Sequence, residues 1–386
     1  MALLRAETDE SGSHLRLRIL FLSQKHPPQK GGVAVSARRI SRALAQQHEV
    51  DLIHLTRDHS PGTMVSRREH DVNVFSLGET AHQAETLQLL ELAAHNLHQH
   101  NPYHLILGFY AVPVGAVAVS VARQLNLPSL VSLRGNDVDR AFYQSGRSGS
   151  LLWALSNATR IVAVSEALKR KAAALSGRDD VVYLPNSVDG ELFFPEPNIS
   201  PRPRHILFAG EMRFKKGLEV LLSALLDLSG DWSLTLAGGA RPEAAEKLER
   251  WRAAHPEHAK RVELLKYARD PERLRRLYAE AEVVINPALW EGMPNSVMEA
   301  LACGRPVLAT PVGGVPELIE HGKHGWLVPT HELDSFGEVL NQLLDSPDRE
   351  SLGKAGRERM LKEFSLQREA EAYLSEVRSL ILSSQP

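Results

Sequence analysis

The sequence predicts an α/β protein built from two doubly wound domains. Short apolar or β-branched runs alternate with longer helical segments along the chain, as in βα units around a buried parallel sheet. A proline-rich stretch at 195–204, PEPNISPRPR, disfavours both helix and central strand, and a new strand, HILFAG, begins directly after it. The length of 386 residues also fits two domains.

Each half of the chain contributes its own series of strands. In the first half, apolar runs predict strands near 17–22, 50–55, 72–76, 105–109, 129–133, 160–164 and 181–183. In the second half, they predict strands near 205–209, 233–237, 262–265, 283–286 and 307–310. The segment 366–382 has the pattern of an amphipathic helix.

These elements predict the domain boundaries. We expect a disordered tail over 1–15, a first domain over 16–195, a linker over 196–204, a second domain over 205–365, and a C-terminal helix over 366–386 that packs back toward the first domain. The tail is polar and mixed in charge, without the apolar core of a signal peptide.

Composition excludes several classes of protein. Hydrophobic residues make up 43% and charged residues 24%, so wholesale disorder is excluded. Lys and Arg number 45 against 47 Asp and Glu, a net charge of -2 that gives no general attraction to nucleic acid, and we expect no such partner. The single cysteine, Cys303, cannot form an internal disulfide or a thiolate metal site. A chain without disulfides is typical of a reducing compartment, so we expect a cytoplasmic location.

The most informative motif is NPALWEGMPNSVMEALACGRPVLATPVGGVPELI, in which a strand, a loop and a helix follow one another. The helix begins near 294–296, and its free N–H groups and dipole suit a phosphate. Glu291 in the loop and Glu299 in the helix would repel that phosphate unless they bind something else, and sugar hydroxyls are the obvious ligands. The alternative is two solvated glutamates.

Two further stretches have the same strand, loop and helix plan. In HILFAGEMRFKKGLEV, the residues Arg213, Lys215 and Lys216 are suited to phosphate oxygens, although a solvated basic loop is the alternative. In ILFLSQKHPPQKGGVAV, Gly31 and Gly32 at a helix start allow a ligand close to the backbone.

Together, PPQKGG, YLPNSVDGELFFP, GEMRFKKG and above all EGMPNSVMEA followed by GRPVLATPVGGVPELI resemble family 4 of the retaining glycosyltransferases. The resemblance covers the chain from about residue 18 to residue 378. It implies the GT-B fold, in which two Rossmann-like domains face each other across a deep cleft.

The resemblance also implies roles for individual residues. Glu291 and the loop after it would bind the donor sugar, Glu299 the ribose, and Lys216 the donor diphosphate. In the family, an arginine that partners this lysine often follows the first glycine of the GxxxxxKG loop. This chain has Glu211 at that position, so we assign the role of the arginine to Arg213, two residues later. The donor-binding set is completed by Gly31, Gly32, Gly292, Met293, Pro294, Asn295 and Ser296.

One position departs from the family. Many members have a histidine near the donor sugar where this chain has Arg134, which cannot accept a proton but suits an anion. The alternative is that Arg134 only pairs with Asp137 or Asp139. These two aspartates form a DVD string, but it offers too few oxygen ligands for a hard cation, and the GT-B resemblance argues against a metal site. We therefore expect no metal, and no cofactor because the nucleotide sugar is a substrate.

The expected function is retaining transfer of a sugar from a nucleotide diphosphate sugar to an acceptor hydroxyl in glycoconjugate synthesis. The alternatives are a catalytically idle sugar-nucleotide-binding subunit and a nucleotide-sugar epimerase on the same fold. Basic residues at 38, 39, 42 and 169–171 predict a peripheral contact with the inner face of the membrane, with a solvated surface as the alternative.

Overall fold

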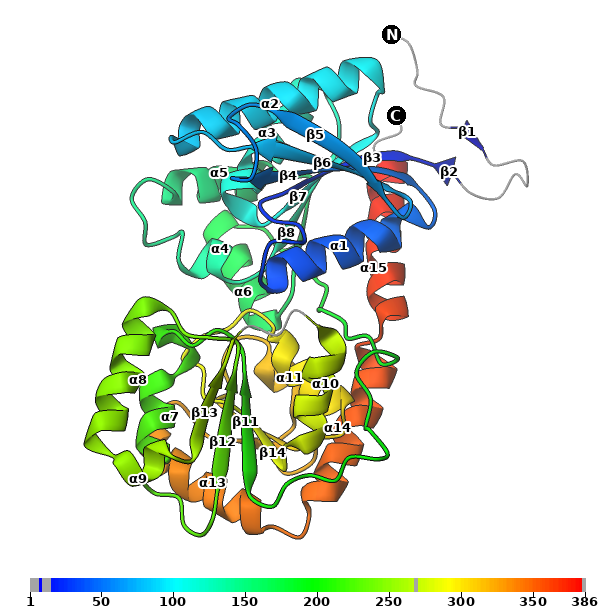
Figure 1. The fold of residues 1–386 in the computed structure, drawn as a ribbon. Coiled ribbons are helices and arrows are strands. Elements are labelled where there is room, and N and C mark those ends of the chain that lie inside the picture. Colours follow the sequence, from blue (N-terminus) through cyan, green and yellow to red (C-terminus); the bar gives the residue numbers. More distant parts are fainter. Residues whose placement is uncertain (1–6, 9–14, 267–269, 384–386) are drawn as a thin grey trace. The chain divides into compact units, whose positions relative to one another are not determined.

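The computed structural model describes residues 7–8, 15–266 and 270–383. The chain divides into two compact units (Figure 1). Unit 1 comprises Met1–Pro185 and Glu369–Pro386, and unit 2 comprises Asn186–Arg368. The boundary at Pro185 precedes the predicted linker, and residues 195–204, which contain no helix or strand, belong to unit 2.

Within the described residues, unit 1 contains an eight-stranded sheet of order β10-β9-β8-β7-β3-β4-β6-β5. Its strands are β3 (Arg18–Ser23), β4 (Glu49–Thr56), β5 (Met64–Glu69), β6 (Val72–Gly78), β7 (Leu105–Phe109), β8 (Ser129–Leu133), β9 (Arg160–Ala163) and β10 (Val182–Tyr183). All pairings are parallel except that of β5 with β6. The inner strands are almost wholly buried, as expected for a sheet covered on both faces.

The helical segments of unit 1 cover both faces of this sheet (Figure 1). They are α1 (Gly32–Ala45), α2 (Gln83–His100), η1 (Ala111–Gly115), α3 (Ala116–Gln124), α4 (Asn136–Asp139), α5 (Ser148–Asn157), α6 (Glu166–Ser176) and, from residue 369 onward, α15 (Leu366–Ser383). One core packs residues of α1 and α15 against the sheet, and another packs residues of α2 and α3.

Two features of unit 1 differ from the sequence analysis. Strand β5 was not predicted, because its residues, MVSRRE, are mostly exposed at the sheet edge and show no apolar alternation. Within the predicted tail, β1 (Glu7–Thr8) pairs antiparallel with β2 (Leu15–Arg16). The rest of that prediction, at 1–6 and 9–14, lies outside the described residues.

Unit 2 contains, in the described part of the chain, a six-stranded parallel sheet of order β13-β12-β11-β14-β15-β16. Its strands are β11 (His205–Ala209), β12 (Ser233–Ala237), β13 (Val262–Leu265), β14 (Val283–Asn286), β15 (Val307–Ala309) and β16 (Trp326–Leu327). Its helical segments are η2 (Phe214–Lys216), α7 (Leu218–Ala224), α8 (Pro242–Ala254), α9 (Pro256–Ala259), α10 (Pro271–Glu280), α11 (Asn295–Ala302), α12 (Val315–Leu318), η3 (Leu333–Ser335), α13 (Phe336–Asp345) and α14 (Arg349–Glu363).

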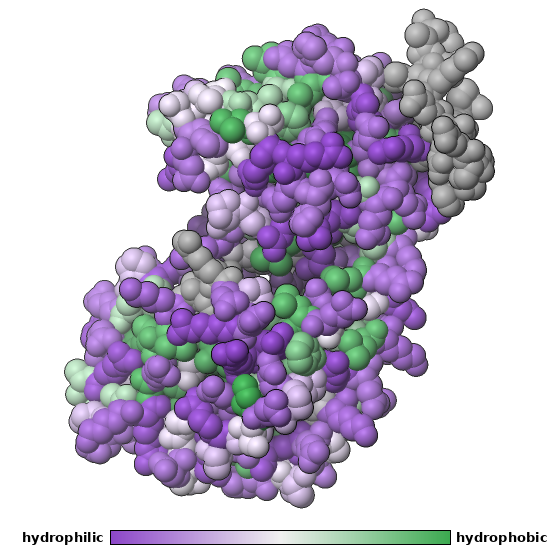
Figure 2. Space-filling model, turned by 45° about the vertical axis from the view of Figure 1, so that its right-hand side comes forward, coloured by the Kyte–Doolittle hydropathy of each residue, from purple (hydrophilic) through white to green (hydrophobic). Residues whose placement is uncertain are grey.

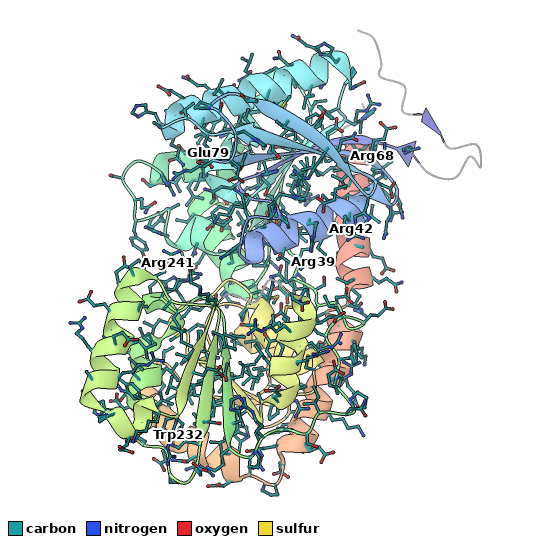
Figure 3. The ribbon with its side chains drawn as sticks, viewed as in Figure 1. Arg39, Arg42, Arg68, Glu79, Trp232 and Arg241 are labelled. Carbon is teal, nitrogen blue, oxygen red and sulfur yellow. The ribbon has the colours of Figure 1, made fainter. Side chains whose placement is uncertain are left out.

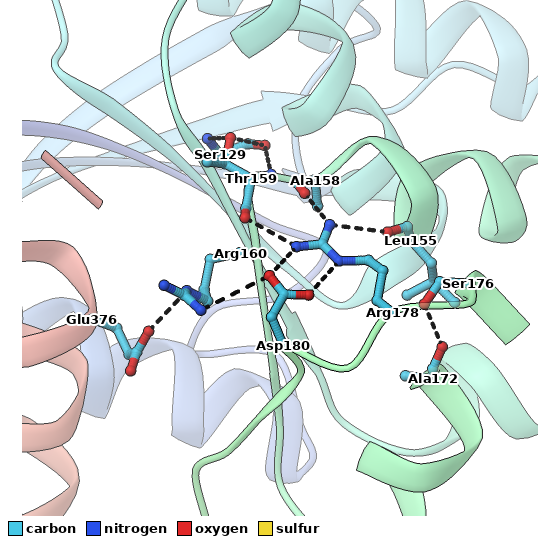
Figure 4. A network of polar contacts seen from close by, with 10 residues as sticks. All are labelled: Ser129, Leu155, Ala158, Thr159, Arg160, Ala172, Ser176, Arg178, Asp180 and Glu376. Atoms are coloured by element: carbon cyan, nitrogen blue, oxygen red, sulfur yellow. Dashed lines mark hydrogen bonds and ion pairs between the residues drawn. The ribbon is translucent and has the colours of Figure 1, made fainter. Parts of the chain in front are cut away.

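The C-terminal helix α15 is bound to unit 1 by apolar and ionic contacts. Tyr373, Leu374, Val377 and Leu380 join the core beneath α1. In the middle of the helix, Glu376 lies 3.1 Å from Arg160 at the start of β9 (Figure 4). Arg160 also lies 3.9 Å from Asp180, which Arg178 contacts at 2.6 Å. The last helix is therefore an integral part of unit 1.

The surface on the face shown in Figure 2 is mainly hydrophilic, with scattered apolar residues. Among the described residues, no helix is both long enough and apolar enough to cross a membrane.

Buried histidines should make the fold sensitive to acid. Burial lowers the pKa of His205 to about 4, with Arg202 adding to the effect, so the folded state favours the neutral ring. Because the unfolded chain takes up the proton near its ordinary pKa of 6.5, stability falls as the pH drops from 6.5 toward 4. Between pH 7 and pH 5 this one group should remove about 2 kcal/mol from the free energy of unfolding.

The measurement is urea unfolding of wild type and His205→Asn at both pH values. The difference between pH 7 and pH 5 should shrink by about 2 kcal/mol in the variant, whatever its stability at pH 7. His331→Asn, at an exposed position, is the matched control and should leave the difference unchanged. An unchanged difference in the His205 variant would contradict the assignment.

Candidate functional site

The first part of the candidate site is formed by two loops that touch at one edge of the unit 2 sheet. A Cβ atom on Gly217, whose φ is +73°, would lie 1.8 Å from the carbonyl oxygen of Pro287, so only glycine fits. The amide of Leu289 donates to the carbonyl of Lys215 at 2.9 Å. Because β11 and β14 pair in parallel, both loops leave the sheet at the carboxyl ends of neighbouring strands.

Three charged side chains are buried where these loops meet, and we call Lys215, Lys216 and Glu291 the charge cluster. Lys216 Nζ donates to Glu291 Oε1, and Lys215 Nζ lies 3.7 Å from Oε2. The exposed fraction of the side chain is 12% for Lys216, 7% for Glu291 and 11% for Lys215. Lys215 was predicted to suit phosphate oxygens together with Arg213 and Lys216, but its contact with Glu291 was not predicted.

The electrostatics of the cluster keep Glu291 ionised. Burial alone would raise the pKa of Glu291, but the charges of Lys216 and Lys215 and the hydrogen bond from Lys216 outweigh it and lower the pKa below its usual value. Two lysines against one carboxylate leave one formal positive charge. This net positive charge makes the cluster suited to bind an anion.

The second part of the candidate site is the start of α11, directly after the loop of Glu291. Pro294 is the N-cap residue, and no side chain caps the helix or places a negative charge in its first turn. Gly292, Met293 and Pro294 are buried, while Asn295 and Ser296 are partly exposed. The amide of Gly314 donates to the carbonyl of Gly292 at 2.6 Å and fixes the loop. The helix start is therefore open to an anionic ligand.

Asn186 holds this loop and was missed as a site residue. Its Nδ2 donates to the carbonyl of Met293 at 3.1 Å and to Asn295 Oδ1 at 3.2 Å, and its amide lies 3.2 Å from Met293 Sδ. The only signal for it in the sequence is its place in YLPNSVDG, which contributed to the family resemblance but suggested no contact.

Glu299 lies on α11 and is partly buried. Its Oε2 accepts a hydrogen bond from the Tyr278 hydroxyl at 2.8 Å. Burial, and then the charge of Glu299, raise the pKa of Tyr278 well above its usual value, so the phenol remains a donor. The hydrogen bond orients the carboxylate, and a carboxylate group can accept several hydrogen bonds at once.

The basic loop also places Arg213 and Glu211. Glu211 stands where the family often has arginine, and it accepts from Arg241 Nε at 3.0 Å (Arg241 is labelled in Figure 3). Arg213 lies 3.9 Å from the same carboxylate, and its charge contributes to lowering the pKa of Glu291. Glu211 is therefore neutralised locally, which leaves the loop net basic.

In unit 1, Gly31 and Gly32 lie at the start of α1. Gly31 has a φ of +114°, and both glycines are exposed. The loop before them is braced, since Gln29 donates to the Leu55 carbonyl at 2.9 Å and accepts from the His26 amide at 3.0 Å. No side chain caps α1, and its first turn has no acidic residue. This helix start is likewise suited to an anion.

Arg134 follows β8 in unit 1 and is mostly buried. Its guanidinium lies over the ring of Phe109, 4.7 Å from the centroid. The charge of Asp137 favours the charged form of Arg134, in line with the alternative that the two residues pair. The Asp137 carboxylate also accepts the backbone amides of Arg134, at 3.0 and 3.1 Å, and Ala111, at 2.8 Å.

The two aspartates of the DVD string therefore have separate tasks. Burial raises the pKa of Asp137 to about 6 even though backbone amides favour its charge, and Asp139 pairs with Lys171 at 2.5 Å. Across the described residues, no group of three or more His, Cys, Asp or Glu side chains could hold a metal ion.

Comparison with known proteins identifies the family. The model of Glycosyltransferase Family 4 matches residues 30–192, and the model of Glycosyl transferases group 1 matches residues 203–346. The chain is 26% identical over 381 residues to the alpha-maltose-1-phosphate synthase of Mycobacterium tuberculosis, covering 90% of this chain and 96% of that protein.

Solved structures share the fold. The sucrose-phosphate synthase of Thermosynechococcus elongatus superposes with a TM-score of 0.80 at 22% identity, over 95% of this chain and 100% of that one. HepE of Anabaena, in complex with UDP-glucose, gives a TM-score of 0.76 at 18% identity, over 94% and 100%. With two parallel-sheet α/β units, the motifs around Glu291 and both family models in agreement, the chain belongs to family 4 of the glycosyltransferases.

Proposed function

We propose that this glycosyltransferase moves a sugar from a nucleotide diphosphate sugar to an acceptor hydroxyl, with retention of anomeric configuration. The charge cluster carries the proposal, because it places two lysines and an ionised glutamate beside the start of α11. Lysines and a helix start bind phosphate, and a carboxylate accepts sugar hydroxyls. The similarity to HepE, solved with UDP-glucose, supports this class of donor.

The leaving group is a nucleoside diphosphate, so negative charge develops on its outer phosphate as the glycosidic bond breaks. Lys216, Arg213 and the start of α11 are assigned to stabilise that charge. Because Lys216 is already bonded to Glu291, donor binding would transfer part of the bonding of the ammonium group to phosphate. Glu291 is then released to accept hydroxyls of the donor sugar.

Glu299 is assigned to the ribose, since the Tyr278 hydrogen bond orients its carboxylate and leaves acceptor capacity. Unchanged nucleotide affinity in Glu299→Ala would contradict this role. Gly31, Gly32 and Arg134 are assigned to the anionic part of the donor from unit 1.

We assign retention to an attack by the acceptor hydroxyl on the same face of the sugar from which the diphosphate leaves. The departing phosphate takes up the proton of that hydroxyl. This route needs no protein nucleophile. Cys303 is no candidate for one, because burial, together with the charge of Glu299, raises the pKa of its thiol to about 12.

Changing the charge cluster should abolish transfer without unfolding the protein. We expect Lys216→Ala and Glu291→Gln each to lower the transfer rate by roughly a hundredfold or more, since each removes a charge on which the proposed transition state depends. The assay offers UDP-, GDP- and ADP-sugars and measures nucleotide release, including slow hydrolysis without acceptor. Circular dichroism checks the fold.

Lys247→Ala provides the matched control, because Lys247 is a half-exposed lysine of the same unit that pairs with Glu219. It should retain wild-type activity. Activity within a few-fold of wild type in either cluster variant would refute the assignment, and a wild type without donor hydrolysis or transfer would favour an idle subunit.

Transfer should persist in excess EDTA. The diphosphate needs positive charge, which a divalent ion provides in many enzymes. Here we assign that charge to the start of α11 and to Lys215, Lys216 and Arg213. Initial rates measured with about 5 mM EDTA and without it should agree within about twofold. Loss of activity that Mg²⁺ or Mn²⁺ restores would reject metal independence.

We also propose a cytoplasmic location with a peripheral contact of unit 1 with anionic membrane, although the structure leaves fewer residues to support that contact. Arg39 is paired with the buried Glu369, and Lys171 with Asp139. Arg42 remains exposed (Figure 3).

Co-sedimentation should therefore show weak, salt-sensitive binding to anionic vesicles and none to neutral ones, because each exposed cation near the surface contributes only about 1 kcal/mol. Arg42→Gln should reduce the bound fraction. Failure to bind both kinds of vesicle would favour a soluble acceptor.

A further inference from the structure

A buried ion pair connects the two ends of unit 1 in the sequence. Arg39 on α1 donates to Glu369 on α15 through two bonds, Nε to Oε2 at 2.5 Å and Nη2 to Oε1 at 2.8 Å. The Glu369 side chain is 4% exposed and that of Arg39 is 16% exposed. Figure 3 labels Arg39 on α1. The bidentate geometry fixes the C-terminal helix against the helix that follows Gly31 and Gly32.

The same face of α15 also contacts β8, the strand directly before Arg134. Glu369 and Tyr373 are four residues apart and therefore share one side of the helix. The Tyr373 hydroxyl lies 2.8 Å from Ser132 Oγ, in β8, and Tyr373 is fully buried. Arg134 follows two residues after Ser132 and lies over Phe109.

The charges around Arg134 are unevenly distributed. Burial lowers the pKa of Arg134, and Arg39 adds to this effect, whereas Tyr373, Glu369 and Asp137 oppose it. The Asp137 carboxylate already accepts three hydrogen bonds from the backbone amides of Arg134 and Ala111. Glu369 thus bonds Arg39 directly and, together with Asp137, stabilises the charge of Arg134.

We propose that Glu369 is a positioning residue for donor binding, because it is bonded to Arg39 on α1 and its helix is hydrogen-bonded to β8, the strand directly before Arg134. The inference rests on the proposed function, in which Arg134, Gly31 and Gly32 bind that part. Without the charge on Glu369, Arg39 and Arg134 repel each other in mostly buried surroundings and α1 loses its ionic link to α15.

The test measures the affinity of the full-length chain for UDP-, GDP- and ADP-glucose by calorimetry, and kcat and KM with the donor that binds best. Glu369→Gln keeps the size of the side chain and removes its charge. We expect Kd and KM to rise roughly tenfold while kcat at saturating donor changes far less, since the residue acts on binding geometry and not on the breaking bond.

Glu376→Gln is the matched control. Glu376 lies on the same helix, is 19% exposed, and pairs with Arg160 at 3.1 Å among residues that include Asp180 and Arg178 (Figure 4). It removes a comparable ion pair without touching Arg39 or Arg134. Loss of donor affinity equal to that of Glu369→Gln would show a general effect of the helix and overturn the proposal.

A double-mutant cycle identifies the route of the effect. If Glu369 acts through Arg134, Glu369→Gln should cost little further affinity in an Arg134→Gln background. Fully additive losses would overturn the proposal, as would an unchanged Kd in the single variant. If Glu369→Gln does not fold, the pair Arg39→Gln with Glu369→Gln replaces it, since both members of the ion pair then lose their charge together.

Binding of sugar nucleotides to the wild type distinguishes a failure of the proposed function from a failure of the role of Glu369. A wild type that binds none of the three sugar nucleotides refutes the proposed function and this inference with it. A wild type that binds one of them, together with a Glu369 variant that binds it equally well, refutes the inference alone.

Discussion

The candidate site depends on the close contact between two loops of unit 2. Gly217 allows the basic loop to pass against Pro287, and the bond from Leu289 to Lys215 fixes the register of the two loops. Only in that register do the lysines reach Glu291 as a buried partner. Since the strands beneath are neighbours in a parallel sheet, the fold brings together cations and a carboxylate that are 75 residues apart in the chain.

Unit 1 achieves a comparable arrangement by a longer route. Its basic groups are on α1 and after β8, and the carboxylate that balances them comes from α15, 330 residues after Arg39. Burial of Tyr373, Leu374 and Val377 in the core holds that helix in place, so apolar packing determines where the charge lies. The ion pair could not form on a helix that was free to move, because ordering two long side chains costs entropy.

The sequence predicted what depends on local pattern and missed what depends on tertiary contact. The strands at 205–209 and 283–286 were predicted at their observed bounds, because continuous apolar runs between turn residues are typical of buried parallel strands. The exposed strand β5 lacks that pattern. The contact of Asn186 with Met293 and the pairing of Glu369 with Arg39 join distant segments, so no spacing in the sequence could reveal them.

Two buried carboxylates show how partners, and not burial, decide what a group can do. Asp137 is bonded to neutral backbone amides, and desolvation raises its pKa to about 6. Glu291 meets two ammonium groups, and its pKa falls below the usual value despite the same desolvation. The carboxylate of Asp137 accepts hydrogen bonds that close the turn after β8. The partners of Glu291 are instead lysine ammonium groups, which an anionic ligand also attracts. An anionic ligand can compete for the ammonium groups that hold a buried acid, whereas it cannot displace an acid from backbone amides in the same way.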